Sequence, residues 1–244
     1  TLYGASDTTY EKLCHAKQVY SKVKSAILKM KEAGLNIKLN CSLTPYNASD
    51  LEEMVNFAKK HKIQLTVSTY MYPPVRRDAK MTGQNDRFSP EEAAWYHMQR
   101  YRYQNGEEAY KKFLKNIQKG VILPPGLDEE CLDSRDGKVR CRAGSATFWV
   151  TWDGYMTPCG MMPEPKVDLD GISFKEAWNK VVALSEKLHT SRICEECSNQ
   201  QMCHSCAAMA YAENGDTSVV PAYVCEMIQA LKTLAEKELR SSGG

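Results

Sequence analysis

The sequence has no apolar run of about eighteen residues, the length that a helix needs to cross a bilayer. It also has little net charge, because 32 basic and 30 acidic side chains leave +2, with both signs interspersed. Such a surface gives no electrostatic reason to bind nucleic acid or an anionic membrane. The first residues, TLYGASD, contain neither a start Met nor a secretory signal pattern. We therefore expect a cytoplasmic protein whose partners include no nucleic acid and no membrane.

The cysteines are the unusual part of an otherwise ordinary globular composition, in which 43% of the 244 residues are hydrophobic and 25% are charged. There are ten of them. Without a secretory signal, they indicate metal binding in a reducing compartment rather than a disulfide framework. A secreted disulfide protein is the alternative, but it gives no reason for two close Cys-x-x-Cys pairs.

Strand and helix patterns alternate along the first seventy or so residues. Three strands are expected, at Thr1–Gly4, Ile37–Leu43 and Ile63–Tyr70. The helix between the first two begins at Asp7 or Thr8, where Thr8 and Glu11 fit a capping box, and ends at Gly34. The helix between the last two begins with the capping box of Ser49 and Glu52 and runs to about His61. This β–α–β–α–β order predicts a parallel sheet covered by helices.

Residues 76–88 predict a loop, because they are polar and basic without periodicity. Ser89 followed by Pro90 then opens a helix to about Asn105, and a second helix covers Glu107–Gln118. Pro124–Gly126 marks the boundary of the cysteine-rich part. Three strands are too few for a closed barrel or a complete doubly wound sheet, so upstream strands are expected to be missing.

The cysteine-rich part contains a strong hairpin signal, because Asp153-Gly154 separates two apolar, aromatic runs. Further elements are expected on both sides of a tight cysteine knuckle. They are a hairpin of 146–152 and 155–159, a helix capped by Ser173 and Glu176 to about His189, the knuckle at Cys194–Cys206, a short helix ending at Asn214-Gly215, a last helix over Ala222–Arg240 and a disordered tail from Ser241 to Gly244.

The spacing of the cysteines is the most informative feature of the chain. It reads C-x12-G-x4-C, a gap, C-x2-C-x5-C-x2-C, a gap and C, through Cys141, Gly154, Cys159, Cys194, Cys197, Cys203, Cys206 and Cys225. Cys131 lies upstream and makes eight cysteines. Eight thiolates can supply two four-ligand sites, and thiolates hold iron–sulfur clusters or structural zinc.

This spacing resembles the SPASM domain, the auxiliary-cluster module of radical S-adenosylmethionine (SAM) enzymes that modify peptides and proteins. The chain departs from the usual form by having two residues, not three, between Cys203 and Cys206. The resemblance covers Cys131–Cys225 and extends upstream more weakly. There TLYGASDTTYEKL, IKLNCSLTPYN and LTVSTYMYPP resemble the fourth, fifth and sixth strands of a radical SAM barrel.

The resemblance implies an α/β fold in which a partial (β/α) barrel fragment precedes a small, cysteine-rich α+β domain. The expected bounds are 1–123 for the second half of the barrel with a helical connector, 124–240 for the SPASM domain and 241–244 for the tail. It also implies two auxiliary [4Fe–4S] clusters. Cys141, Cys159 and Cys206, with Cys131 as the fourth ligand, would hold the first. Without Cys131, that cluster would keep an iron open to substrate. The second would be held by Cys194, Cys197, Cys203 and Cys225.

The family's CxxxCxxC motif for the SAM cluster is absent, and so is its Gly-Gly-Glu stretch. The chain therefore resembles the C-terminal portion of a longer enzyme and is not expected to cleave SAM alone. A third [4Fe–4S] cluster and SAM would be bound by the full-length enzyme. Thr1, Asn40 and Met71 match positions near SAM or substrate in relatives. The alternatives are an ordinary strand residue for Asn40 and a core residue for Met71. Cys14 and Cys41 are expected to be buried thiols rather than ligands.

The function implied is modification of a ribosomally made peptide or protein by a thioether or carbon–carbon crosslink. The auxiliary clusters would bind substrate or carry electrons, with flavodoxin or ferredoxin as electron donor; no catalytic residue can be named. Sulfatase maturases of the family carry Asp after the second motif cysteine, where this chain has Gly160. That departure weighs against a sulfatase-maturase-like protein oxidase, which stays an alternative. A zinc knuckle that binds protein or RNA is another, and a ferredoxin-type electron carrier is a third.

Overall fold

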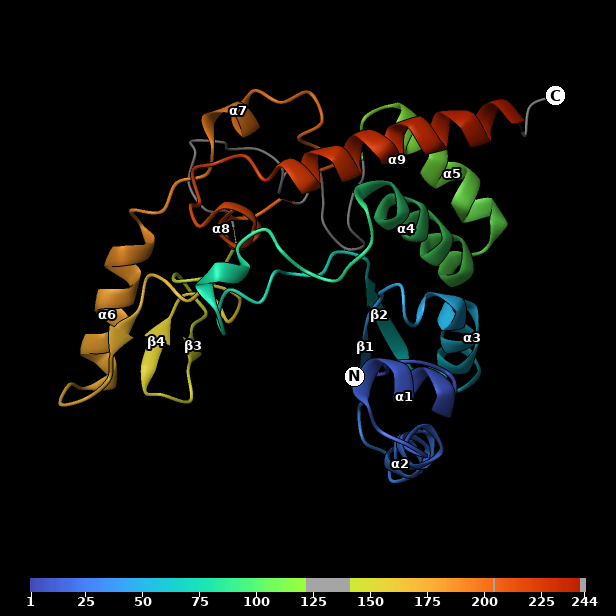
Figure 1. Ribbon diagram of the computed structural model, residues 1–244, viewed down its shortest axis with the longest axis horizontal. Coiled ribbons are helices and arrows are strands. Elements are labelled where there is room, and N and C mark those ends of the chain that lie inside the picture. The colour runs from blue at the N-terminus through green and yellow to red at the C-terminus, as the bar shows by residue number, and fades with distance from the viewer. Residues whose placement is uncertain (122–140, 204, 242–244) are drawn as a thin grey trace. The chain divides into compact units, whose positions relative to one another are not determined.

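The computed structural model describes residues 1–121, 141–203 and 205–241 (Figure 1). The chain divides into two compact units, each made of separate stretches. Unit 1 comprises Thr1–Met71, Asp86–Gln118 and Gln229–Gly244, and unit 2 comprises Tyr72–Asn85 and Lys119–Ile228. The predicted domain bounds at 123 and 124 lie outside the described residues and stay a prediction, as does the tail beyond Ser241.

The centre of unit 1 is a parallel pair of strands, β1 (Lys38–Ser42) and β2 (Gln64–Ser68). Side chains alternate along β1, with Leu39 and Cys41 buried and Lys38 and Asn40 exposed. Thr1–Gly4 is not a strand, but the Leu2 N–H donates to the Asn40 carbonyl at 2.8 Å. The predicted β–α–β arrangement is thus confirmed for β1 and β2. The described residues form no closed barrel; they form this pair and one three-stranded sheet.

The predicted helix from Asp7 to Gly34 is wrong, because two helices stand there: α1 (Asp7–Cys14) and α2 (Tyr20–Glu32). The break contains two residues with left-handed backbone, His15 at φ 52° and Gln18 at φ 53°. The cap prediction is wrong too, since Ser6 accepts the Thr9 N–H. Asp7 instead accepts the Tyr20 N–H at 2.8 Å, at the start of α2.

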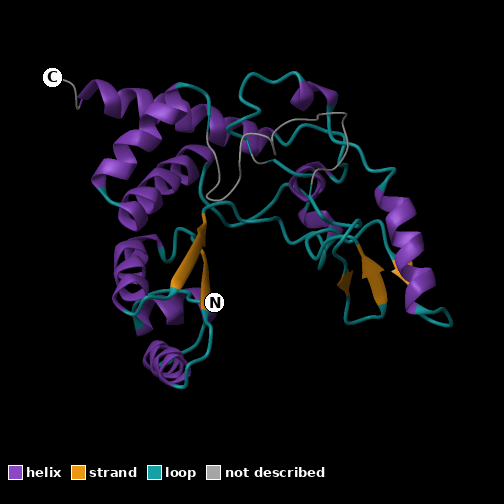
Figure 2. Ribbon diagram, turned by 180° about the vertical axis from the view of Figure 1, so that it is seen from behind, coloured by secondary structure: helices purple, strands orange, loops and turns teal. Residues whose placement is uncertain are grey.

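A 3₁₀ turn, η1 (Ala48–Asp50), leads into α3 (Leu51–Lys60), which buries one apolar face beside the sheet (Figure 2). The predicted capping box of Ser49 and Glu52 is wrong, because Asp50 is the N-cap residue and no side chain caps the helix. The Asp50 carboxylate accepts the Ala5 N–H at 2.7 Å instead. A tertiary hydrogen bond, from Ala5 to Asp50, therefore stands where the sequence predicted a local capping bond.

Three helices complete unit 1: α4 (Pro90–Asn105), α5 (Glu107–Gln118) and the C-terminal part of α9 (Ala222–Ser241). The capping box of Ser89 and Glu92 opens α4, and the predicted α4 and α5 are confirmed. The Tyr110 hydroxyl donates to Glu238 at 2.7 Å, which fastens α5 to α9. None of the helices in the described part of the chain is long and apolar enough to cross a membrane.

Unit 2 contains the predicted hairpin, as β3 (Trp149–Val150) and β4 (Tyr155–Thr157) in antiparallel pairing. Gly154 turns the chain with φ 86°. A third strand, β5 (Val167–Asp168), pairs with β4 and was not predicted. The helix α6 (Phe174–Ser185), capped by Ser173, packs on this sheet and ends earlier than predicted.

Short helices follow around the knuckle. They are α7 (Arg192–Glu195), which was not predicted, and α8 (Ala207–Asn214), which ends at Gly215 as predicted. The last helix, α9, matches its prediction to within one residue at its C-terminal end and carries Cys225 in its first turn. The predicted loop at 76–88 holds one 3₁₀ turn, η2 (Ala79–Met81).

Candidate metal centres in the cysteine-rich unit

All the described cysteines of the motif lie in unit 2. They lie beside the hairpin, in the knuckle and in α9. Cys141 precedes the hairpin, Cys159 follows β4, and Cys206 is the N-cap residue of α8. Cys131 lies outside the described residues, so its predicted role as a ligand stays a prediction.

Cys159 and Cys206 contact the same small apolar cluster, whose buried members are Met162, Ala207 and Ala208. Tyr72 and Leu188 contact that cluster too. The Cys159 sulfur accepts the Met161 N–H at 3.4 Å. A strand end and a helix start, 47 residues apart in the sequence by their numbers (206 minus 159), are therefore brought together at one site.

The thiols of this first group influence one another. Burial raises the pKa of Cys159, the Met161 N–H lowers it, and charge at Cys206 and Cys141 raises it further. Burial also raises the pKa of Tyr72, and charge at Cys206, Cys159 and Cys141 adds to the effect. Cys141, which is itself exposed, therefore lies within electrostatic range of the other two thiols.

The second group consists of Cys194 in α7, Cys197 after it, Cys203 and Cys225 in α9. Burial raises the pKa of Cys203 to about 11; the Ser205 N–H lowers it, and charge at Cys225, Cys194 and Cys197 raises it. Burial likewise raises the pKa of Cys194, and charge at Cys225 and Cys197 raises it further. The chain thus gathers four thiols from three segments around one place.

Both groups contain thiols only, the donor set that iron–sulfur clusters take. Among the residues that the structure describes, no three His, Cys, Asp or Glu side chains lie close enough to hold one metal ion. In a four-iron cluster each cysteine binds a different iron, so its sulfurs stand farther apart than around a single ion. The donor chemistry of each group is therefore compatible with an iron–sulfur cluster, and a set of four thiolates is also one that structural zinc takes.

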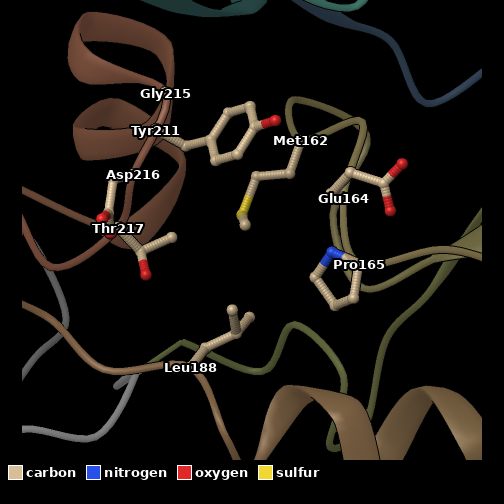
Figure 3. Close-up of a pocket in the computed structure, with 8 residues that line it drawn as sticks. All are labelled: Met162, Glu164, Pro165, Leu188, Tyr211, Gly215, Asp216 and Thr217. Atoms are coloured by element: carbon tan, nitrogen blue, oxygen red, sulfur yellow. The ribbon is translucent and has the colours of Figure 1, made fainter.

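A cavity of about 330 Å³ adjoins the first group (Figure 3). Met162 and Leu188, which contact the cluster of Cys159 and Cys206, also line this cavity. The remaining lining residues are Glu164, Pro165, Tyr211, Gly215, Asp216 and Thr217. Sequence reasoning missed this cavity, because no motif marks residues that come from three separate segments.

The three residues predicted near SAM lie in unit 1. Thr1 and Asn40 are exposed, and the bond from the Leu2 N–H to the Asn40 carbonyl places them on neighbouring segments. Met71 is half-buried, and its carbonyl accepts Arg87 at 3.0 Å. Nothing in the described contacts joins Met71 to the other two, so the shared SAM role stays a prediction.

The two remaining cysteines differ in surroundings. Cys41 is a buried thiol whose sulfur lies 3.9 Å from that of Met54, and burial raises its pKa to about 12. Cys14 is exposed, so the prediction that it is buried is wrong. Its position at the end of α1, before the unpredicted break, accounts for the exposure.

No protein family and no curated protein matches this sequence. Solved structures of radical SAM enzymes share its fold. One is native anSMEcpe, a radical SAM/SPASM sulfatase-maturating enzyme, with bound AdoMet; it is 15% identical, with a TM-score of 0.58 over 98% of this chain and 66% of that one. The same protein with bound AdoMet and the Kp18Cys peptide is also 15% identical, with a TM-score of 0.54 over 94% of this chain and 63% of that one.

This chain therefore spans just under two thirds of the length of the solved chains that it resembles. At 15% identity, the likeness concerns the fold: an α/β arrangement of helices and small sheets similar to that of a radical SAM enzyme.

Proposed function

We propose that this chain is the C-terminal part of a radical SAM enzyme that modifies a ribosomally made peptide or protein. The observation that carries the proposal is the grouping of the described motif cysteines. Cys159 and Cys206 contact the same apolar cluster, and Cys141 lies within electrostatic range of Cys159. Cys194, Cys197 and Cys225 lie within electrostatic range of Cys203. These are the sets that the resemblance to the SPASM domain implies for two auxiliary clusters, apart from Cys131.

Under this proposal the first group holds one [4Fe–4S] cluster, with Cys131 or an open iron as the fourth position, and the second group holds the other. When bound, such clusters supply electron transfer and a site for a substrate sulfur or nitrogen. The protein's own part is to fix the ligands: the Met161 N–H bonds to the Cys159 sulfur, and α8 begins at Cys206.

The peptide substrate is supported by the fold shared with anSMEcpe, which has been solved with a bound peptide. The cavity beside the first group offers apolar side chains, Met162 and Leu188, to a residue of such a peptide (Figure 3). A crosslink of thioether or carbon–carbon type is the reaction we favour. SAM, a third cluster and an electron donor such as flavodoxin or ferredoxin belong to the full-length enzyme in this account.

A sulfatase-maturase-like oxidation of a protein is the second candidate, and the fold of anSMEcpe favours it. Gly160 weighs against it, because the expected Asp is missing and a Cβ at residue 160 would meet the ring of Trp149 at 3.0 Å. Binding of the Kp18Cys peptide to the cluster-loaded chain would support this second candidate over the first.

The proposal is tested by loading the chain anaerobically with iron and sulfide and, in parallel, with zinc. We expect brown protein with sulfur-to-iron charge-transfer absorption, and an electron paramagnetic resonance (EPR) signal after reduction with dithionite. Colourless protein that keeps zinc in preference to iron would overturn the proposal and favour the zinc knuckle.

A further inference from the structure

The segment Tyr72–Asn85 contacts both ends of α8. It follows the strand β2 closely in the sequence, but it belongs to unit 2, whereas β2 belongs to unit 1. At the N-terminal end of α8, the Tyr72 hydroxyl lies 3.8 Å from the sulfur of Cys206. At the C-terminal end, the Gly83 N–H donates to the Ala212 carbonyl at 2.9 Å. Asn85 then donates to the Tyr72 carbonyl at 2.9 Å, which closes the segment on itself.

Gly83 allows the backbone of this segment to approach the backbone of α8 closely. Its φ is 68°, and a Cβ there would meet the Glu213 carbonyl oxygen at 2.9 Å. Only glycine combines this close approach with this conformation. The position of Tyr72 beside Cys206 is therefore supported by the backbone bond from Gly83 to Ala212 in α8, the helix that begins after Cys206, and by the Asn85 bond within the segment.

The Tyr72 side chain enters the first cysteine group from outside the cysteine motif. Its ring contacts the cluster formed by Met162, Ala207 and Ala208, in company with Cys159 and Cys206. In the free thiol form either the hydroxyl or the thiol can donate across the 3.8 Å contact. A sulfur bound to iron has no proton, so the hydroxyl must then be the donor.

We propose that Tyr72 is a positioning residue for the first auxiliary cluster, donating a hydrogen bond to the Cys206 ligand and thereby raising the reduction potential of that cluster. This inference rests on the proposed function, because it requires a cluster on Cys206. A hydrogen bond to a ligand sulfur stabilises the extra negative charge of the reduced cluster, and such bonds are among the factors that set the potential.

The test compares Tyr72→Phe with Tyr155→Phe in the cluster-loaded chain. Both variants lose one tyrosine hydroxyl in unit 2, but the Tyr155 ring lies under the Lys166 ammonium group, at 4.9 Å. Iron content and the two midpoint potentials are measured, the latter by EPR-monitored redox titration. We expect unchanged iron in both variants, one potential shifted to more negative values in Tyr72→Phe, and neither potential shifted in Tyr155→Phe.

A second variant keeps the hydroxyl and guards against a simple folding defect. Replacing Tyr72 by 3-fluorotyrosine makes the hydroxyl a stronger donor, so the same potential should move in the positive direction. Two clusters with potentials that neither Tyr72 variant moves would overturn this inference alone. No cluster in the unaltered chain would overturn the proposed function together with it.

Discussion

The ring of Trp149 lies so close to Gly160 that a Cβ added at residue 160 would meet its ring atoms at 3.0 and 3.1 Å. Gly160 directly follows Cys159. Sulfatase maturases of the family that this chain resembles carry Asp at the position of Gly160. Trp149 occupies the space that such a side chain would need. The glycine at residue 160 and the packing of the hairpin therefore agree, because the indole ring leaves little room for a side chain there.

Gly160→Ala should lower the free energy of unfolding of unit 2 by about 1 kcal/mol, the low end for overpacking, because the added methyl group pushes aside an indole ring that is half exposed. Combining it with Trp149→Ala should remove most of that cost, since the ring is then absent. A double-mutant cycle by urea unfolding measures the coupling. Strictly additive effects of the two substitutions would show that residue 160 does not contact Trp149.

Substitution of single cysteines should remove iron by groups. Cys159→Ser and Cys203→Ser should each lose about half of the iron, because each opens one of two clusters and leaves the other intact. Cys14→Ser is the matched control: this thiol is exposed and lies in unit 1, so iron should be unchanged. Loss of all iron from either variant would indicate a single shared site.

Ser89→Ala should lower the free energy of unfolding by about 1 kcal/mol, because Ser89 accepts the Glu92 N–H at 3.2 Å at the start of α4. Ser49→Ala is the control, since the Ser49 hydroxyl donates to the Asp50 carboxylate and caps no helix. We expect that control to change stability by less than about 0.5 kcal/mol. Equal losses for both serines would contradict the capping assignment.

Asn47→Ala should lower the free energy of unfolding of unit 1 by about 2–4 kcal/mol. The side chain is fully buried; its oxygen accepts the Thr44 N–H at 2.7 Å, and its nitrogen donates to the carbonyls of Tyr3 and Ser42 at 2.9 and 3.1 Å. Alanine leaves these three backbone groups without that partner. Asn36→Ala, at an exposed position, serves as the control, and a similar loss there would contradict the account.

Local signals predicted the fold well where no distant partner competes. The helix start at Ser89 and Pro90, the turn at Gly154 and the helix stop at Gly215 are all confirmed. The failures have local and tertiary causes: Ser6 caps the first helix in place of the predicted residues, and a distant partner binds Asp50. The Asp50 carboxylate binds the Ala5 N–H, 45 residues away, and neither Gly nor Pro marks the break after Cys14.

The candidate site likewise has features that the sequence predicted and features that it could not predict. The grouping of the cysteines was available from the sequence through the resemblance of their spacing to the SPASM domain, and not from distance along the chain, because the two sets interleave. Tyr72 could not be predicted, since its contact with Cys206 joins residues 134 positions apart and no motif includes it. The cavity lined by Met162 and Leu188 depends on packing between segments in the same way.

The most direct measurement is the iron and acid-labile sulfide content of the unaltered chain after anaerobic reconstitution, with zinc determined on the same sample. Two auxiliary clusters require about eight iron and eight sulfide per chain. That result would give the seven cysteines of the motif, from Cys141 to Cys225, one common role as cluster ligands. Stoichiometric zinc without sulfide would contradict the account and leave a zinc-binding module in its place.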